Sequence, residues 1–193
     1  MRGYFGIGIE GISKAMNIGS LFRTANAFNA SFVFTVAANY SRSGGNRSDT
    51  SDAPGHMPFY SFPNITSMVL PAECTLIGVE LTDDAIELPS FRHPLQATYI
   101  LGPERGSISS EMTEKCEFIV KIPSQFCINV GVAGAIIMYD RIKSLGKFKQ
   151  RPIRPGGSKE DLPKHVFGDP IIRKKIKKFR DTQPVYDTEI DTA

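Results

Sequence analysis

Residues 98–106 decide the fold of this chain and read Thr98-Tyr99-Ile100-Leu101-Gly102-Pro103-Glu104-Arg105-Gly106. The apolar run that ends at Leu101 predicts a strand, and the Gly-Pro pair after it predicts a tight turn. Glycine on both sides of the charged pair leaves room for a bulky group to approach the backbone. Ligands of α/β sheets bind beyond the carboxyl ends of the strands. We therefore expect a ligand at this turn, in preference to a solvated ion pair.

Short apolar runs like this one recur along the chain and alternate with helical patterns. Strands are predicted at residues 4–9, 32–36, 75–79, 98–101 and 117–122, and helices at 17–28, 65–70, 109–115 and 130–145. The strand runs are continuously apolar, as in sheets that are covered on both faces. The pattern predicts an α/β fold with a mostly parallel sheet and helices on both faces. Residues 39–55 lack an apolar period and predict a long mobile loop.

Composition excludes several classes of protein. The chain has 193 residues, of which 41% are hydrophobic and 22% charged, as in a globular domain. No apolar run approaches the ~18 residues of a membrane span, so we expect no membrane partner. The amino terminus lacks the pattern of a secretory leader, which favours a cytoplasmic protein.

Cysteine and histidine give no sign of a metal. Cys74, Cys116 and Cys127 are odd in number and form no Cys-x-x-Cys pair, which predicts reduced thiols. Cys127 is expected to be a buried, inert thiol. His56, His93 and His165 lack ligand-spaced partners, so we expect them on the surface or in loops and predict no metal site.

Positive charge is concentrated near the carboxyl terminus. Residues 1–140 hold 9 basic and 13 acidic side chains, whereas residues 141–193 hold 14 basic and 7 acidic ones. We expect a domain over residues 1–150 and a basic, partly helical tail over residues 151–193. Six basic residues of the tail are candidates for contact with a polyanionic partner: Arg173, Lys174, Lys175, Lys177, Lys178 and Arg180. A membrane-surface or purely solvated helix is the alternative interpretation.

Two further segments place polar residues where packing does not require them. Asn17 is predicted to cap the helix over 17–28, and Arg23 lies almost two turns further on. Asn129 stands at the start of the helix over 130–145, whose first residues are small enough for another segment to pack very closely. The alternative interpretation of the first segment is a capped amphipathic helix with Arg23 on the surface. The alternative for the second is a capped core helix.

In this order and spacing the three segments resemble the SpoU (TrmH-type) family of RNA 2′-O-ribose methyltransferases, in the SPOUT superfamily. The family's first motif, Asn-x-Gly-x-x-x-Arg-x-Ala, matches at Asn17, Gly19, Arg23 and Ala25. The second matches from Leu101 to Gly106, with Ser107 in an extra place before Ile108. The third matches at Ile122-Pro123 and then at Cys127-Ile128-Asn129-Val130-Gly131, where Cys127 and Gly131 replace two serines.

The resemblance implies an α/β knot, a deep trefoil through which the carboxyl-terminal part of the domain threads. It implies S-adenosylmethionine as cofactor, held in a pocket formed by Leu81, Leu101, Gly102, Ile122, Cys127 and Ile128. It also implies a homodimer in which Arg23 acts across the interface.

The same resemblance implies that Asn17, Arg23, Glu104 and Asn129 are the catalytic residues, acting on tRNA or rRNA. Arg23 is expected beside the acceptor nucleotide as a phosphate anchor, because a guanidinium is effectively always protonated. A general base, with its pKa reduced in a dry site, is the alternative role. Glu104 is expected to hold Asn17 or Arg23 in place, and Asn129 to shape the cofactor pocket.

Two other functions stay open from the sequence. The changes at Cys127 and Gly131 favour a non-catalytic RNA-binding or ribosome-associated protein that keeps the fold. Asn17, Arg23, Glu104 and Asn129 favour an enzyme, because a binding protein has no need of them. A methyltransferase for a small molecule or a protein is a third option, which the basic tail disfavours.

Overall fold

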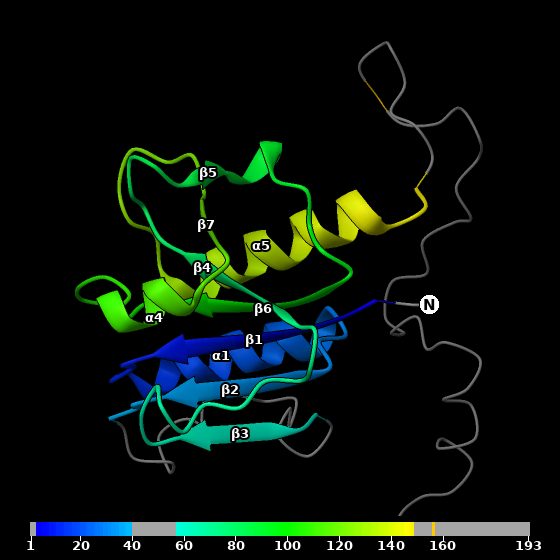
Figure 1. The fold of residues 1–193 in the computed structure, drawn as a ribbon. Coiled ribbons are helices and arrows are strands. Elements are labelled where there is room, and N and C mark those ends of the chain that lie inside the picture. Colours follow the sequence, from blue (N-terminus) through cyan, green and yellow to red (C-terminus); the bar gives the residue numbers. More distant parts are fainter. Residues whose placement is uncertain (1–2, 40–56, 149–155, 157–193) are drawn as a thin grey trace, which may run out of the picture. The chain divides into compact units, whose positions relative to one another are not determined.

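The computed structural model describes residues 3–39, 57–148 and 156, and these contain one seven-stranded sheet. Every strand pair in it is parallel, and the strand order is β3-β2-β1-β6-β4-β7-β5. The arrowheads of β1, β2, β3 and β6 point the same way in Figure 1. Parallel strands bring their carboxyl ends to one edge of the sheet. The predicted α/β class with a mostly parallel sheet is confirmed.

The strands are β1 (Tyr4–Glu10), β2 (Phe32–Val36), β3 (Phe59–Phe62), β4 (Thr75–Val79), β5 (Ile86–Glu87), β6 (Gln96–Leu101) and β7 (Phe118–Lys121). The helices are α1 (Ala15–Ala27), α4 (Ser110–Lys115) and α5 (Val130–Leu145), with a short 3₁₀ helix, η1 (Leu88–Ser90). Five of these strands and these three α-helices match elements predicted from the sequence, which also predicted a fourth helix. β3, β5 and η1 were missed because they are only two to four residues long and depend on their neighbours.

The helix predicted at residues 65–70 is wrong. The backbone there forms a turn, in which the Met68 N–H donates to the Ile65 carbonyl at 3.2 Å. Asn64 and Ser67 bond each other locally, with the Ser67 N–H donating to Asn64 Oδ1 at 2.8 Å. Such side-chain bonds compete with helix formation, and Pro71 disfavours helical backbone at the residue before it.

Two apolar layers cover the two faces of the sheet. Neighbouring residues of one strand alternate between them: Tyr99 of β6 belongs to the layer under α1 and α5, and Ile100 to the layer under α4. On the α4 side, a side chain at Gly8 would lie 2.5 Å from the ring of Phe34. The absence of a side chain at Gly8 therefore lets the aromatic ring of β2 lie across β1.

Helices α1 and α5 pack against each other at very close range, as the small residues of α5 predict. A Cβ added at Gly134 would lie 2.2 Å from Leu21 Cδ1 of α1. A Cβ at Gly131 would lie 3.5 Å from Ser20 Cβ. This contact brings the amino-terminal turns of α1 and α5 side by side, which positions the polar residues described below.

A buried polar cluster lies at the opposite end of the sheet and includes His93. This residue lies in the loop before β6, one of the two places expected for it, but not at the surface. That side chain is only 3% exposed, with Nδ1 2.6 Å from the Tyr99 hydroxyl and Nε2 3.0 Å from Asp140 Oδ2. Arg141 Nη1 donates to the same hydroxyl at 3.2 Å. Burial lowers the pKa of His93 although Asp140 opposes the shift, and burial raises the pKa of Tyr99 to about 12. The neutral phenol therefore donates to a neutral imidazole.

Arg141 also donates to the carbonyls of Tyr4, Pro94 and Leu95. It thereby ties the carboxyl-terminal half of α5 to the amino ends of β1 and β6.

None of the helices described is long and apolar enough to span a bilayer. Across residues 3–39 and 57–148, no three His, Cys, Asp or Glu side chains are grouped so that they could hold a metal ion. The loop over 40–55, His56, His165, the domain boundary near residue 150 and the tail residues Arg173 to Arg180 lie outside the described residues.

Candidate active site

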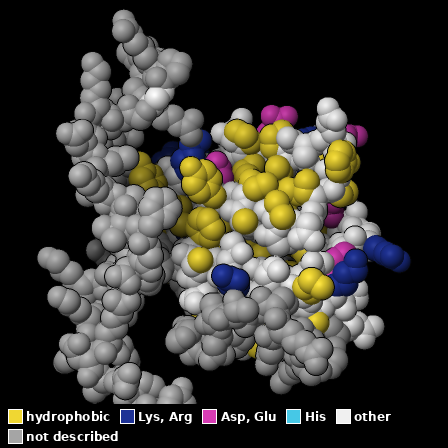
Figure 2. Space-filling model, turned by 180° about the vertical axis from the view of Figure 1, so that it is seen from behind, with side chains coloured by type: hydrophobic (Ala, Val, Ile, Leu, Met, Phe, Trp, Pro, Cys, Tyr) yellow, Lys and Arg dark blue, Asp and Glu magenta, His cyan; other side chains and the backbone are white. Residues whose placement is uncertain are grey.

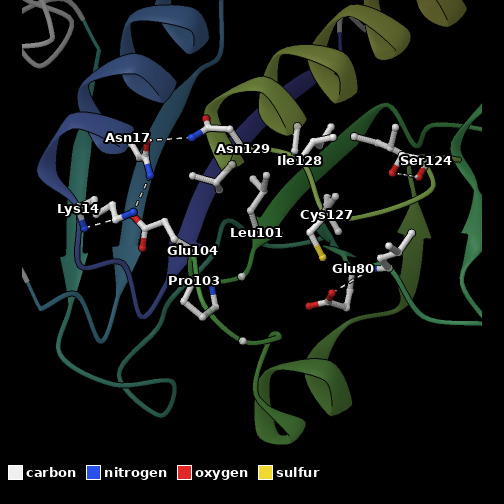
Figure 3. Close-up of a pocket in the computed structure, with 17 residues that line it drawn as sticks. Lys14, Asn17, Glu80, Leu101, Pro103, Glu104, Ser124, Cys127, Ile128 and Asn129 are labelled. Atoms are coloured by element: carbon white, nitrogen blue, oxygen red, sulfur yellow. Dashed lines mark hydrogen bonds between the residues drawn. The ribbon is translucent and has the colours of Figure 1, made fainter.

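A cavity of about 360 Å³ opens where β4, β6 and β7 end (Figure 3). Its size falls within the range of small-molecule sites, ~300–1,000 Å³. All six residues predicted to hold the cofactor line it: Leu81, Leu101, Gly102, Ile122, Cys127 and Ile128. Asn17, Glu104 and Asn129 line it as well. The structure therefore brings nine of the ten predicted residues of the pocket and catalytic centre to one cavity.

A chain of hydrogen bonds joins the three sequence motifs along one side of this cavity. The Gly131 N–H donates to Asn129 Oδ1 at 2.9 Å, and Asn129 Nδ2 donates to Asn17 Oδ1 at 3.1 Å. Asn17 Nδ2 then donates to Glu104 Oε1 at 2.9 Å. The side-chain amides of Asn17 and Asn129 each accept one hydrogen bond through Oδ1 and donate one through Nδ2. Each amide therefore has a single orientation that allows all of these hydrogen bonds.

Glu104 is the acceptor at the end of this chain and is charged. Its carboxylate also accepts from the Lys14 N–H at 3.1 Å and from the Ser13 N–H and hydroxyl at 3.4 and 3.3 Å. Partial burial raises the pKa of Glu104, but the hydrogen bonds from Asn17 and from nearby backbone N–H groups outweigh it. The net pKa lies below the ordinary value of 4.5. Of the two residues that Glu104 was expected to hold, Asn17 and Arg23, it bonds Asn17.

Asn17 does not cap helix α1, contrary to the sequence prediction. The helix begins at Ala15 with Lys14 as the capping residue, and the Lys14 side chain makes no capping hydrogen bond. The Asn17 side chain instead bonds Glu104 and Asn129, which are 87 and 112 residues away in the sequence. Asn129 does cap α5, through the bond to Gly131. Local sequence cannot distinguish these two asparagines, because the partners of Asn17 are distant in the chain.

Arg23 is the one predicted catalytic residue that does not line the cavity. It lies on the exposed side of α1, two turns beyond Asn17. Met16 and Ser20 share this exposed side at helical spacing, and Met16 is 69% exposed. The geometry of a single chain thus separates Arg23 from the other three predicted residues.

Cys127 is exposed on the cavity wall, which corrects the expectation of a buried thiol. It belongs to the segment between Ile122 and α5, where Ser124 Oγ lies 3.2 and 3.1 Å from the carbonyls of Ile122 and Phe126. These bonds curl the segment around the cavity, so that Cys127 faces the space instead of the core (Figure 3).

Comparison with known proteins settles the family. Residues 5–139 match the model of the SpoU rRNA Methylase family. The chain belongs to this family. A curated mouse tRNA (guanosine(18)-2′-O)-methyltransferase is 35% identical over 69 residues, which cover 34% of this chain and 4% of that protein. An uncharacterized tRNA/rRNA methyltransferase of Archaeoglobus fulgidus is 26% identical over 144 residues, covering 71% of this chain and 63% of the relative.

Solved structures share the fold. The AdoMet-bound rRNA methyltransferase from Sinorhizobium meliloti has a TM-score of 0.66 and 16% identity, over 75% of this chain and 58% of that one. The SpoU methyltransferase AviRb from Streptomyces viridochromogenes, in complex with AdoMet, has a TM-score of 0.65 and 19% identity, over 74% and 61%. This SpoU family chain therefore spans less than two thirds of the length of these relatives.

Glu80 and Lys14 line the cavity and were not singled out in the sequence. Glu80 follows β4 directly, and Lys14 precedes α1. The signal for Glu80 was present, because a charged residue at the carboxyl end of a parallel strand lies where ligands of α/β sheets bind. No comparable signal marks Lys14, since a basic residue before a helix is common on protein surfaces.

The charge on Glu104 should make the stability of this SpoU protein depend on pH. A carboxyl whose folded pKa is depressed stabilises the fold above its unfolded pKa, and this contribution disappears as the pH falls through the folded value. Urea unfolding of Glu104→Gln should show the largest deficit against wild type near neutral pH. The deficit should shrink below the ordinary pKa of 4.5. A deficit that stays constant down to about pH 3 contradicts the depressed pKa.

Proposed function

We propose that this protein is an S-adenosylmethionine-dependent RNA methyltransferase that modifies a ribose 2′-hydroxyl of tRNA or rRNA. The observation that carries the proposal is the cavity itself. Three segments, each unremarkable alone, meet around it and are joined through Asn17, Glu104 and Asn129. Membership of the SpoU family supports the same activity. The replacement of two serines by Cys127 and Gly131 leaves the cavity open, since neither residue fills it.

The lining suits a nucleoside cofactor that is partly apolar and partly charged. Leu81, Leu101, Ile122 and Ile128 supply apolar walls, while Gly102 leaves backbone accessible beside them. S-adenosylmethionine, when bound, supplies a methyl group that its sulfonium has already activated. The protein then has two tasks: to align the acceptor hydroxyl and to let it lose its proton.

Arg23 performs the alignment in this proposal. Its guanidinium stays protonated and binds a phosphate in a planar, two-pronged geometry, which fixes the neighbouring ribose. Glu104 and Asn17 act through position: their hydrogen bond, with that of Asn129, holds the cavity side of α1 against the strand ends. Asn129 both lines the cavity and bonds Asn17, so it shapes the cavity wall next to α1.

Because Arg23 does not line the cavity of its own chain, we propose a homodimer in which Arg23 of one protomer acts at the cavity of the other. The outer side of α5 carries exposed apolar residues, with Val132 51% and Tyr139 58% exposed, and Met16 of α1 is exposed as well. Figure 2 shows hydrophobic side chains gathered on the face seen from behind. Pairing these surfaces about a two-fold axis covers them and carries Arg23 of each protomer toward the partner's cavity. The inner side of α5 belongs to the core.

Two further features belong to the proposal. The fold shared with the SpoU structures supports the trefoil knot, in which the carboxyl-terminal part of the domain threads through a loop of the chain. The free cysteines Cys74, Cys116 and Cys127 support a reducing compartment, the cytoplasm.

The activity test uses labelled S-adenosylmethionine with undermodified total RNA, followed by mapping of alkali-resistant ribose. Wild-type protein should bind the cofactor in calorimetry and transfer label to RNA. Arg23→Ala should lower turnover at least about 100-fold, because the acceptor loses its alignment, while cofactor affinity stays nearly unchanged. Arg92→Ala, at an exposed arginine outside the cavity lining, is the matched control.

Each outcome of that test has a meaning. Cofactor binding without transfer to any RNA contradicts the enzyme and supports the non-catalytic RNA-binding alternative. Transfer to a protein or small molecule contradicts RNA as the substrate. Loss of cofactor binding in Arg23→Ala contradicts the role given to Arg23.

Subunit complementation tests the dimer. Cys127→Phe should block the cavity from an exposed position while leaving Arg23 intact. Mixed with Arg23→Ala, it should form heterodimers in which one site combines an intact cavity with an intact arginine. If subunits of the two variants exchange at random in an equal mixture, half of the dimers are heterodimers, and each has one working site of two. The mixture should therefore show roughly a quarter of the wild-type methyltransferase activity. No recovery, with exchange verified by mass spectrometry, contradicts action across the interface.

The tail is proposed to contact RNA. If about four of its basic side chains neutralise phosphates, deleting residues 171–193 should reduce the log–log salt slope of single-stranded RNA binding by roughly 3. Cofactor binding should be unchanged. A full-length control in which Arg173, Lys174, Lys175, Lys177, Lys178 and Arg180 become glutamine should reproduce the loss. An unchanged slope in both proteins contradicts RNA contact by the tail.

A further inference from the structure

Glu80 borders the cavity on the side away from Asn17 and Glu104 (Figure 3). It directly follows β4, and its N–H donates to the Val120 carbonyl of β7 at 3.0 Å. Lys121 holds the turn that follows, through bonds of 3.0 and 2.9 Å to the carbonyls of Thr82 and Asp83. The backbone on both sides of Glu80 is therefore fixed.

Two backbone N–H groups fix the carboxylate of Glu80 as well. Oε1 accepts from the Leu81 N–H at 2.9 Å, and Oε2 accepts from the Ile108 N–H at 2.9 Å. The second bond crosses 28 residues and closes the turn that starts at Gly102, where an added Cβ would lie 3.0 Å from Ile108 N. Both carboxylate oxygens thus have a set position before any ligand arrives.

The carboxylate retains capacity for further donors. Two carboxylate oxygens offer about four acceptor sites, and the two backbone bonds use one on each oxygen. Within the described residues, no lysine or arginine forms a salt bridge with Glu80. A ligand that displaces water from the cavity must offer donors to these free acceptor sites of the half-buried carboxylate.

A ribose diol fits this requirement. Its two neighbouring hydroxyls can supply two donors to the two oxygens of one carboxylate. In dinucleotide-binding folds, an Asp or Glu likewise bonds the ribose 2′-hydroxyl. We propose that Glu80 is a specificity-determining residue that recognises the ribose hydroxyls of the nucleoside cofactor. This inference rests on the cofactor named in the proposed function.

Calorimetry with S-adenosylhomocysteine and its 2′-deoxy and 3′-deoxy analogues tests the inference on the full chain. Glu80→Gln should weaken binding of S-adenosylhomocysteine roughly 10- to 100-fold, the range for hydrogen bonds to a charged acceptor. Wild type should lose affinity for the deoxy analogues to a similar extent. The two losses should not add, because the variant and the analogue remove the same bonds.

Glu10→Gln is the matched control, because Glu10 holds the next residue of the same turn from outside the cavity lining. Its carboxylate accepts from the Ser109 N–H at 2.9 Å and from the Ser109 hydroxyl at 2.5 Å. If Glu80 acted only by holding the turn, both variants would weaken all three ligands by the same factor. Thermal unfolding of both variants verifies that they fold.

The outcomes separate the inference from the proposed function. Failure of wild type to bind S-adenosylhomocysteine contradicts the cofactor itself. Wild-type binding with an unchanged affinity in Glu80→Gln overturns the role of Glu80. An equal loss for all three ligands also overturns it, since that result indicates general attraction or turn stability instead of ribose recognition.

Discussion

The Asn17 side chain occupies the position on which the site depends, because it bonds two groups that are far away in the sequence. It donates to Glu104 and accepts from Asn129, and so joins α1 to the turn after β6 and to the start of α5. An amide is suited to this place, since it donates and accepts at once. A carboxylate at position 17 would oppose Glu104, and an apolar residue would leave Glu104 and Asn129 without this partner.

This link requires that α1 and α5 lie very close together, and the small residues of α5 make that possible. Gly134 admits Leu21 at a distance no larger residue allows, and Gly131 leaves space beside Ser20. The same helix presents apolar residues outward at Val132 and Tyr139. One helix therefore sets the geometry of the cavity on its inner side and offers a surface for a second copy on its outer side.

The cavity also depends on acids that receive backbone N–H groups. Glu104 accepts from Ser13 and Lys14, Glu80 from Leu81 and Ile108, and Glu10 from Ser109. Each bond anchors a loop that would otherwise have only its own turn chemistry to hold it. Loops at the carboxyl ends of parallel strands carry function because a rigid sheet positions them. Here charged side chains extend that rigidity beyond the strand ends.

The sequence by itself determined the parallel α/β class, five of the strands and three helices, because apolar periodicity is a local property of the chain. It indicated the residues that meet at the cavity only through motifs that resemble those of a known family. Only the tertiary structure decided the orientation of Asn17, the burial of His93 and the exposure of Cys127. Each of these features depends on contacts that local sequence does not reveal. Asn17 bonds Glu104, His93 bonds Tyr99 and Asp140, and Cys127 lies in the segment that Ser124 curls around the cavity. Short elements such as β3 and β5 also needed the tertiary structure, since strands of two to four residues form only beside a neighbour that supplies their hydrogen bonds.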